Sequence, residues 1–222
     1  MSVDDDKRLA AEAAVAEVQD GMIVGLGTGS TAAFAIEALA RRCAAGLRIE
    51  AVATSEASTA AALAGGIIVR DFADIATLDL AIDGADEIDG RLWAIKGAGG
   101  AMLREKTVAA AAWRFVVIAD GSKRVDAVGA AKLPVEVLPF AREFVVAQLQ
   151  QLGAVAAVRP DYLTDNGNLV ADCRFAAMPD PRSLAAAIAA IPGALGHGLF
   201  LDEVDAAYVA AAGTITRLER PA

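Results

Sequence analysis

Short apolar runs recur along the first half of the chain, and most are followed by a stretch with helical spacing. The runs that predict strands span residues 22–26, 47–54, 67–70, 78–82, 92–95 and 115–119. Helices are predicted at 4–19, 55–64 and 101–112, and from the glycine-rich turn at 25–31 to about residue 43. Apolar strands with little alternation, joined by helices, are typical of a parallel sheet covered on both faces. We therefore predict an α/β fold: a Rossmann-like open, mostly parallel sheet with helices on both faces.

The pattern changes near Val128. Strands are predicted at 134–139, 154–159 and 169–174, helices at 140–152 and 181–191, and a turn at 164–168 where Asn-Gly supplies the positive φ that hairpins need. The order strand, helix, strand, strand, helix predicts a smaller α+β (ferredoxin-like) domain. Strands at 206–211 and 214–219 are expected to return to the first sheet. We thus expect a catalytic α/β domain (1–128 and 204–222) and a small α+β domain (129–203) that contributes to oligomerisation.

The formal net charge of −9 over 222 residues disfavours nucleic acid or an anionic membrane as the main partner, because both need basic surface. An anionic substrate would need positive charge supplied locally. The chain has no charge-free apolar stretch of about 20 residues, the length that crosses a membrane, and its first residues are too acidic for a signal peptide. Cys43 and Cys173 lack metal-type spacing, so we expect reduced, structural thiols in a cytoplasmic protein.

A glycine-rich turn, Gly25-Leu-Gly-Thr-Gly-Ser-Thr31, follows the first predicted strand. Its glycines let the backbone approach a ligand, and the amides of the next helix favour a phosphate or carboxylate. The hydroxyls of Thr28, Ser30 and Thr31 add donors. Ser30 stands where the dinucleotide fingerprint has its third glycine, which disfavours a nicotinamide dinucleotide site. The alternative is an ordinary tight turn with a capped helix.

A cluster of acids, Asp83-Gly-Ala-Asp-Glu-Ile-Asp89, follows the strand predicted at 78–82. Open α/β sheets bind ligands at the carboxyl ends of their strands, so we expect these carboxylates to face a ligand crevice. Asp83 and Asp86 are best placed to bind sugar hydroxyls or to assist proton movement during ring opening. A solvated acidic turn and a divalent-metal site are the alternatives.

A third motif, Lys96-Gly-Ala-Gly-Gly-Ala-Met-Leu-Arg-Glu-Lys106, combines an ammonium, flexible backbone and a carboxylate. Glu105 falls early in the predicted helix, where burial against Lys96 and the helix field would tune it to move a proton between carbons. A plain charged helix face is the alternative. Lys123 either reaches the same crevice or is a surface lysine. His197 is the only histidine, which disfavours a catalytic triad or a two-histidine metal site, and we expect it to be structural or peripheral.

Eight motifs occur in order from about residue 8 to the end of the chain. They are Gly25-Leu-Gly-Thr-Gly-Ser-Thr-Ala32, Thr54-Ser-Glu-Ala-Ser58, Asp83-Gly-Ala-Asp-Glu-Ile-Asp89, Lys96-Gly-Ala-Gly-Gly-Ala-Met-Leu-Arg-Glu-Lys106, Ile118-Ala-Asp-Gly-Ser-Lys123, Leu133-Pro-Val-Glu-Val-Leu-Pro139, Leu163-Thr-Asp-Asn-Gly-Asn168 and Gly198-Leu-Phe200. Together they resemble the type A ribose-5-phosphate isomerase family. Eight motifs in register are far more specific than any one of them.

The resemblance implies interconversion of ribose 5-phosphate and ribulose 5-phosphate in the pentose phosphate pathway, without metal or organic cofactor. Glu105 would be the base that moves a proton between C1 and C2 through an enediolate, while Asp83 would help ring opening and Lys96 would stabilise oxyanion charge. The pentose 5-phosphate would contact Thr28, Gly29, Ser30, Thr31, Asp83, Gly84, Ala85, Asp86, Lys96, Gly97, Ala98, Gly99 and Lys123. The family is usually homo-oligomeric, so a homodimer or homotetramer is expected.

The chain departs from the family pattern in the third motif. It has Lys-Gly-Ala-Gly-Gly where Lys-Gly-Gly-Gly-Ala is usual, and Leu103 stands where threonine is frequent. Ala98 adds a methyl group beside the expected substrate, which would alter affinity without removing a reacting group. Two alternative functions are a non-catalytic sugar-phosphate sensor, which turnover would exclude, and an amino-sugar-phosphate deaminase, which would release ammonia. Such sensors normally carry a basic DNA-binding segment, and the deaminase needs histidine-assisted ring opening.

Overall fold

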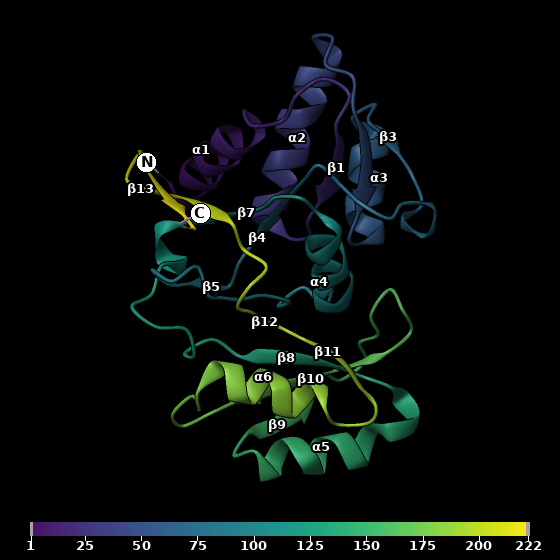
Figure 1. The fold of residues 1–222 in the computed structure, drawn as a ribbon, viewed down its shortest axis with the longest axis vertical. Coiled ribbons are helices and arrows are strands. Elements are labelled where there is room, and N and C mark those ends of the chain that lie inside the picture. The colour runs from purple at the N-terminus through teal and green to yellow at the C-terminus, as the bar shows by residue number, and fades with distance from the viewer. Residues whose placement is uncertain (1, 221–222) are drawn as a thin grey trace.

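A seven-stranded sheet forms the centre of the larger part of the molecule (Figure 1). The structure is a computed structural model that describes residues 2–220. The strand order is β14-β13-β7-β4-β1-β2-β3, and all neighbours pair in parallel except β13 and β14 at one edge. The strands are β1 (Ile23–Leu26), β2 (Glu50–Ala53), β3 (Ile68–Val69), β4 (Leu80–Gly84), β7 (Phe115–Asp120), β13 (Ala206–Ala211) and β14 (Thr214–Glu219). The predicted open, mostly parallel sheet is confirmed.

Helices cover both faces of this sheet. Successive strand residues point to opposite faces, so each strand contributes side chains to both layers of helices. On one face α1 (Val3–Val15), α2 (Ser30–Ala44) and α3 (Glu56–Ala64) share a core with Leu80 and Ile82. On the other face α4 (Met102–Ala111) shares a core with Ala81. The buried sides of α1 and α2 are mostly alanine, so a core with few aromatic rings is filled by close approach of helix and sheet. No helix within residues 2–220 has the length and the apolar run needed to cross a membrane.

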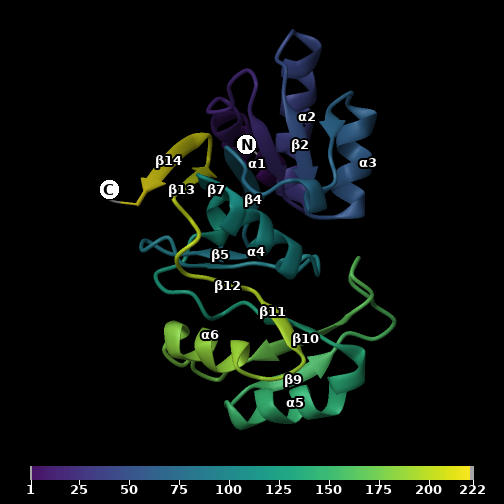
Figure 2. The same ribbon diagram turned by 45° about the vertical axis from the view of Figure 1, so that its right-hand side comes forward.

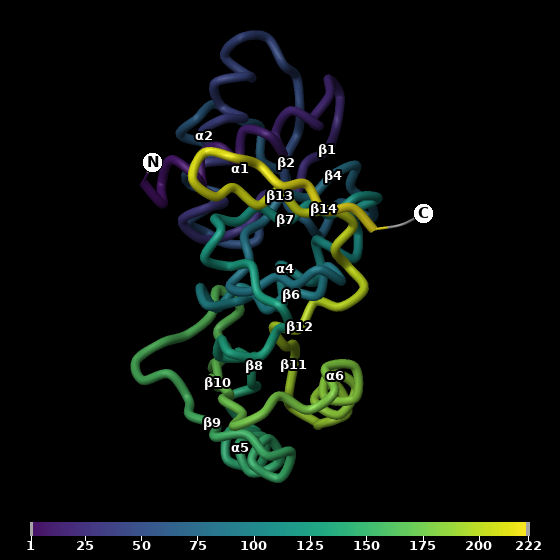
Figure 3. The backbone as a smooth tube through the Cα atoms, turned by 90° about the vertical axis from the view of Figure 1, so that its left-hand side faces the viewer, coloured from purple at the N-terminus to yellow at the C-terminus, as the bar shows by residue number. Residues whose placement is uncertain are grey.

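The C-terminal hairpin β13–β14 lies beside α1 and β7, although almost the whole chain separates it from α1 (Figure 3). Asp6 of α1 accepts hydrogen bonds from the amides of Ala212 and Gly213 in the hairpin turn, at 3.0 and 2.9 Å. The prediction that the last two strands return to the first sheet is therefore confirmed.

Residues 133–197 form a second, four-stranded antiparallel sheet with two helices, called here the α+β unit. Its elements are β8 (Leu133–Val137), α5 (Arg142–Gln151), β9 (Val155–Val158), β10 (Leu169–Arg174), α6 (Pro181–Ala189) and β11 (Ala194–His197), and its strand order is β11-β8-β10-β9. This is the predicted ferredoxin-like arrangement. The sequence did not predict β11, because Ala194-Leu-Gly-His197 has no β-branched residue. The division into two domains at residues 128 and 204 remains a proposal.

A three-stranded sheet, β12-β6-β5, lies between the large sheet and the α+β unit (Figure 2). Its strands are β5 (Glu87–Ile88), β6 (Ala94–Ile95) and β12 (Leu199–Phe200). β6 lies within the strand predicted at 92–95, but neither β5 nor β12 was predicted. Three short 3-10 helices, η1 (Phe72–Asp74), η2 (Gly121–Lys123) and η3 (Pro139–Ala141), complete the fold.

Several predicted boundaries were too wide. The helix predicted at 4–19 ends at Val15, because Arg42 of α2 donates to the carbonyl oxygens of Val15 and Val18 and so satisfies the helix end. The strand predicted at 47–54 pairs only from Glu50 to Ala53, since the amide of Leu47 bonds back to Arg42. The helix predicted at 140–152 begins with η3 and becomes α-helical at Arg142.

The topology reverses between β1 and β4. These strands are neighbours, yet the chain continues from β1 toward β2 and β3, and from β4 toward β7 and β13. Such a reversal opens a crevice at the carboxyl ends of the two strands, where ligands of open α/β sheets bind. The glycine-rich turn follows β1 and the acid cluster begins at the end of β4, so the fold brings two of the three predicted motifs to this crevice.

Candidate active site

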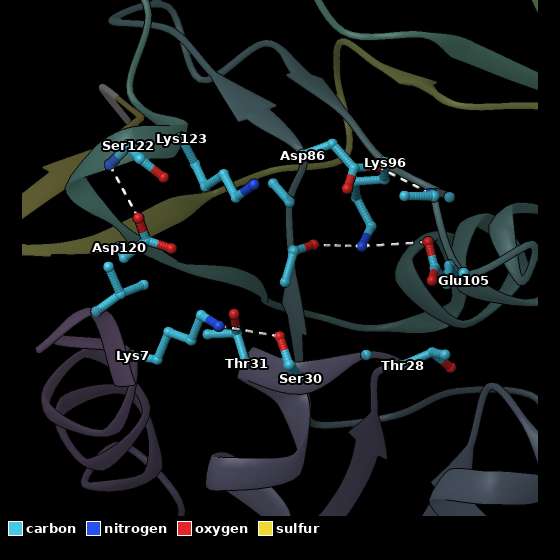
Figure 4. A pocket seen from close by; sticks show the side chains of 17 residues that line it. Lys7, Thr28, Ser30, Thr31, Asp86, Lys96, Glu105, Asp120, Ser122 and Lys123 are labelled. Carbon is cyan, nitrogen blue, oxygen red and sulfur yellow. Dashed lines mark hydrogen bonds and ion pairs between the residues drawn. The ribbon is translucent and has the colours of Figure 1, made fainter. Parts of the chain in front are cut away.

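A cavity of about 300 Å³ opens at the crevice (Figure 4). The loops after β1, β4, β6 and β7 and the starts of α1, α2 and α4 form its walls. It is lined by Val3, Lys7, Thr28, Gly29, Ser30, Thr31, Gly84, Ala85, Asp86, Lys96, Gly97, Ala98, Gly99, Glu105, Asp120, Ser122 and Lys123. Each residue predicted to bind substrate lines the cavity except Asp83, which is buried at the end of β4 with 3% of its surface exposed.

A buried ion cluster occupies one end of the cavity. The Lys96 ammonium contacts Asp83 Oδ2 at 2.8 Å and Glu105 Oε2 at 3.2 Å, and it donates a hydrogen bond to the carbonyl oxygen of Gly84. Only 2% of Lys96 is exposed. The rings of Phe200 and Phe115 have their centroids 5.4 and 6.0 Å from this nitrogen. Because Lys96, Asp83 and Glu105 are all almost fully buried, each charge in the cluster acts strongly on the others.

Two carboxyl groups share one ammonium, so the fully ionised cluster would carry an excess negative charge. Burial, followed by the charge of Asp83, raises the pKa of Glu105 to about 8. Burial also raises the pKa of Asp83, against the opposing effect of Lys96. Burial lowers the pKa of Lys96, but the two carboxylates outweigh this and raise it, so the ammonium stays charged.

The hydrogen bonds indicate which carboxyl group holds the proton that the pair shares. Asp83 Oδ1 accepts the amides of Thr28 and Gly84 at 3.0 and 2.7 Å, and both bonds favour the ionised form. Oε2 of Glu105 pairs with the Lys96 ammonium and has no hydrogen-bond partner among the described residues. We therefore place the shared proton on Glu105 in the ligand-free protein, with Asp83 ionised.

The turn after β1 packs so closely on Asp83 that only glycine fits at position 27. A Cβ atom on Gly27 would lie 1.9 Å from Asp83 Oδ1. The amide of Gly27 bonds to the carbonyl oxygen of Ile82 at 2.9 Å, and the next amide, that of Thr28, bonds to Asp83 itself. The turn and β4 are thus joined through backbone atoms, which fixes where the ion cluster lies relative to the anion-binding side of the cavity.

The second of the eight motifs, residues 54–58, supports the same turn from outside the cavity. The hydroxyls of Thr54 and Thr28 lie 2.7 Å apart, and Ser58 Oγ donates to the carbonyl oxygen of Gly27 at 2.6 Å. Ser55 caps α3 by accepting the amide of Ser58 at 3.1 Å. These side chains hold the turn and do not line the cavity. Their hydroxyl groups therefore have a structural role that needs no contact with the substrate.

Positive charge lies at the other end of the cavity, away from Glu105 (Figure 4). Lys7 of α1 donates to Ser30 Oγ at 3.2 Å and pairs with Asp4 at 3.3 Å, while Lys123 comes from η2 after β7. The N-cap of α2 is Gly29, which has no side chain to satisfy the first amides of the helix. Two ammonium groups and the start of a helix make this end suited to an anionic group.

Sequence reasoning missed four lining residues: Val3, Lys7, Asp120 and Ser122. A signal for Lys7 existed, because a helix that precedes a parallel strand runs antiparallel to it and must begin at the carboxyl edge of the sheet. Asp120 ends β7, so the rule that placed the acid cluster also applies to it, and its Oδ1 accepts the amide of Ser122 at 2.9 Å. Both residues are thus placed at the cavity by the position of their elements in the sheet rather than by the chemistry of a motif.

His197 lies outside the cavity, on β11. Its Nδ1 accepts the amide of Leu199 at 3.3 Å, and burial lowers the pKa of the imidazole to about 4, so the ring is neutral at pH 7. Cys43 and Cys173 are free thiols. Within the part of the chain that the structure describes, no group of three or more histidine, cysteine or acidic side chains is arranged to hold a metal ion.

The geometry defines a class of site. A carboxyl group tuned for proton transfer lies beside an ammonium that can stabilise oxyanion charge, and cations for an anionic group lie at the far end. Such a site suits a small phosphorylated or carboxylated substrate whose reacting atoms lie away from its anionic group. Comparison with known proteins identifies the family to which a site of this class belongs.

The profile of the family Ribose 5-phosphate isomerase A (phosphoriboisomerase A) matches residues 50–214. Ribose-5-phosphate isomerase A of Sphingopyxis alaskensis is 54% identical, covering 92% of this chain and 92% of its own, and that of Roseiflexus castenholzii is 48% identical, covering 97% and 95%. A solved D-ribose-5-phosphate isomerase in complex with phospho-erythronic acid is 34% identical, with a TM-score of 0.95 over 99% of this chain and 100% of that one. Ribose 5-phosphate isomerase A from Neisseria gonorrhoeae is 36% identical, with a TM-score of 0.94 over 100% and 99%. The chain belongs to the ribose 5-phosphate isomerase A family.

Replacing Gly27 with alanine is expected to destabilise the protein by about 1–3 kcal/mol, the range for overpacked sites, because the new methyl group would displace Asp83. Gly90→Ala is the matched control, since no atom lies within 4 Å of a Cβ atom added there. Urea unfolding of the wild type and both variants measures the difference. A Gly27→Ala midpoint equal to that of the wild type would contradict the close packing of the turn on β4.

Glu105→Gln should change how stability depends on pH. The pKa of Glu105 is about 8 in the folded protein and 4.5 as its reference value, so the folded state binds the proton more tightly. The stability that this proton contributes is complete below about pH 4.5 and is lost as the pH rises through about 8. The wild type should therefore lose melting temperature relative to Glu105→Gln between about pH 5 and pH 9, whereas an exposed control, Glu12→Gln, should follow the wild type. A constant difference between wild type and Glu105→Gln would place the shared proton elsewhere.

Proposed function

We propose that this protein is a ribose-5-phosphate isomerase that interconverts D-ribose 5-phosphate and D-ribulose 5-phosphate. The observation that carries the proposal is the carboxyl group of Glu105, buried beside the Lys96 ammonium at one end of a cavity whose other end holds two lysines. A pentose 5-phosphate has the same polarity, with its reacting carbons at one end and its phosphate at the other. The relatives at 54% and 48% identity carry this name, which supports the assignment.

The phosphate group would bind where positive charge and free amides meet. Lys7 and Lys123 supply the charge, and Ser30 and Thr31 supply hydroxyls at the uncapped start of α2. Binding there would direct the sugar chain toward Lys96 and Glu105. The related enzyme that holds phospho-erythronic acid supports a phosphorylated sugar acid as a ligand for this site.

The chemistry follows from two proton movements. In the open-chain aldose, the carboxylate of Glu105 takes the proton from C2 and an enediolate forms. The same proton is returned to C1, while O1 gains a proton and O2 loses one, so that the aldehyde becomes an alcohol and C2 becomes the ketone carbon. Negative charge on the oxygens would be stabilised by Lys96, whose ammonium is already oriented and little hydrated.

The acidic loop would bind the sugar hydroxyls and orient the side chain of Lys96. Asp86 lines the cavity, and its Oδ2 accepts the amide of Ala98 at 2.9 Å, so it joins two walls of the site. Asp83 pairs with the Lys96 ammonium and so holds it in place. The part that Asp83 is expected to take in ring opening remains a prediction. Thr28, the segment 84–86 and the segment 97–99 would complete the contacts to the sugar.

We further propose that the reaction proceeds without metal or organic cofactor, that the protein acts in the pentose phosphate pathway of the cytoplasm, and that it is a homodimer or homotetramer. A sugar-phosphate sensor remains the alternative of another class, and turnover of ribose 5-phosphate would exclude it. An amino-sugar-phosphate deaminase is less well supported, since His197 lies outside the cavity.

Purified protein treated with a chelator should convert ribose 5-phosphate to ribulose 5-phosphate. Ketose formation measures this conversion. Glu105→Gln should lose at least about 10²-fold in turnover, the scale for a positioned base, while still binding substrate. Because the base must be ionised, kcat/KM should rise with pH up to about 8. Wild-type protein that binds the sugar phosphate without converting it would instead be a sensor, and near-normal turnover by Glu105→Gln would move the base to Asp83 or Asp86.

Lys7→Gln should raise KM for ribose 5-phosphate about 10–100-fold with little change in kcat, which is the effect of losing one charged hydrogen bond. Lys132→Gln is the matched control, because this lysine is half exposed, pairs with Asp172 and lies outside the cavity. Initial rates over a range of substrate concentrations measure both constants. A KM unchanged by Lys7→Gln would place the phosphate elsewhere in the cavity.

A further inference from the structure

The glycine loop that follows Lys96 is held from outside by one segment of the α+β unit. This segment is the connection between β9 and β10, residues 159–168. Arg159 donates from Nη1 to the carbonyl oxygen of Ala98 at 2.8 Å and from Nη2 to that of Gly97 at 3.4 Å. Tyr162 donates its hydroxyl to the carbonyl oxygen of Gly99 at 2.7 Å. Three successive carbonyl groups of the loop are thus bound by two side chains that lie three positions apart.

The opposite side of the same loop lines the cavity. Gly97, Ala98 and Gly99 are all lining residues, and the amide of Ala98 is fixed by Asp86. The loop is therefore held between the acid cluster on one side and Arg159 and Tyr162 on the other. A backbone fixed on both sides keeps its shape before the substrate arrives, which lowers the entropy that binding would otherwise cost.

Tyr162 also accounts for the unusual position of glycine in this loop. Gly100 has φ of +80°, and a Cβ atom there would lie 2.0 Å from Tyr162 Oη and 2.6 Å from Tyr162 Cζ. A methyl group on residue 100 would therefore overlap the ring of Tyr162 where it lies in this structure. The departure noted in the sequence, Gly-Ala-Gly-Gly in place of Gly-Gly-Gly-Ala, thus leaves position 100 free for the tyrosine ring.

The two side chains support each other as well as the loop. The Arg159 guanidinium lies 5.4 Å from the centroid of the Tyr162 ring. Asp172 of β10 accepts hydrogen bonds from its Nε and Nη2, with Nη2 to Oδ1 at 2.7 Å. Burial raises the pKa of the Tyr162 hydroxyl, so it remains a donor at neutral pH. The β9–β10 connection therefore presents a rigid pair of donors to the loop.

We propose that Tyr162, together with Arg159, is a positioning residue that sets the shape of the substrate loop 97–99, and that Gly100 is the partner which this tyrosine requires. The consequence for substrate binding rests on the proposed function, whereas the consequence for the loop does not. The α+β unit then acts on the active site of its own chain through the β9–β10 connection.

Tyr162→Phe tests the loop directly, because it keeps the ring and removes only the donor. Amide hydrogen exchange of residues 97–101 in the ligand-free protein should become about five-fold faster, the effect of losing one neutral hydrogen bond, while the melting temperature stays close to that of the wild type. Tyr208→Phe is the matched control: its hydroxyl bonds to Glu17, remote from the cavity, and exchange at 97–101 should not change. Unchanged exchange in Tyr162→Phe would overturn the proposal.

The steady-state constants test the effect on substrate. Tyr162→Phe should raise KM for ribose 5-phosphate about five-fold and leave kcat within about two-fold, because Lys96 and Glu105 keep their own contacts. A fall in kcat with unchanged KM would contradict the positioning role. If the wild type does not turn over ribose 5-phosphate, the proposed function fails, and the exchange measurement still decides the role of Tyr162.

A double-mutant cycle tests the pairing of Tyr162 with Gly100. Gly100→Ala should expel the tyrosine ring and so speed exchange at 97–101 at least as much as Tyr162→Val does, because alanine is also strained at the φ of +80°. Exchange in the double variant Gly100→Ala/Tyr162→Val should then be no faster than in Gly100→Ala alone, because the tyrosine contact is already lost there. Because Tyr162→Val removes the steric conflict, the double variant also remains informative if Gly100→Ala alone fails to fold. Effects that multiply in the double variant would contradict the pairing.

Discussion

The ammonium of Lys96, buried between two carboxyl groups, is the interaction on which the rest of the site depends. One ammonium neutralises one carboxylate, and burying a second negative charge beside it is unfavourable. Glu105 therefore holds a proton that an exposed glutamate would lose, with a pKa of about 8. The arrangement costs stability in the resting protein, and it gives Glu105 a proton affinity suited to taking a proton from carbon near neutral pH.

The fold brings this cluster and the cationic end of the cavity to a fixed separation. Asp83 ends β4, and Gly27 after β1 packs directly on it, so the start of α2 is fixed relative to the carboxyl groups through backbone contacts. The start of α1 adds Lys7 from the same edge of the sheet. Local placement explains how a chain of net charge −9 can present a cationic site to an anionic group.

Strong local patterns allowed most of the fold and the core of the candidate site to be predicted from the sequence. Runs of apolar residues identified the long strands, and acids, glycines and a lysine placed after strands identified the loops that meet at the crevice. Two-residue strands such as β5 carry no periodicity, and glycine-containing β11 lacks β-strand composition. Lys7 and Tyr162 could not be placed by motif chemistry, because their roles depend on which elements the topology brings together. The value of glycine at position 100 became clear only when the ring of Tyr162 was seen beside it.

The protonation state of Glu105 is the central claim, and a carboxyl-specific titration measures it most directly. Protein labelled with ¹³C at the glutamate side-chain carboxyl carbons can be followed by NMR between about pH 4 and pH 10, with Glu105→Gln used to assign the signal. We expect one glutamate signal that titrates near pH 8 and is missing from the variant. A Glu105 signal that is fully ionised below about pH 6 would contradict it, because the buried ammonium would then stabilise both carboxylates at once.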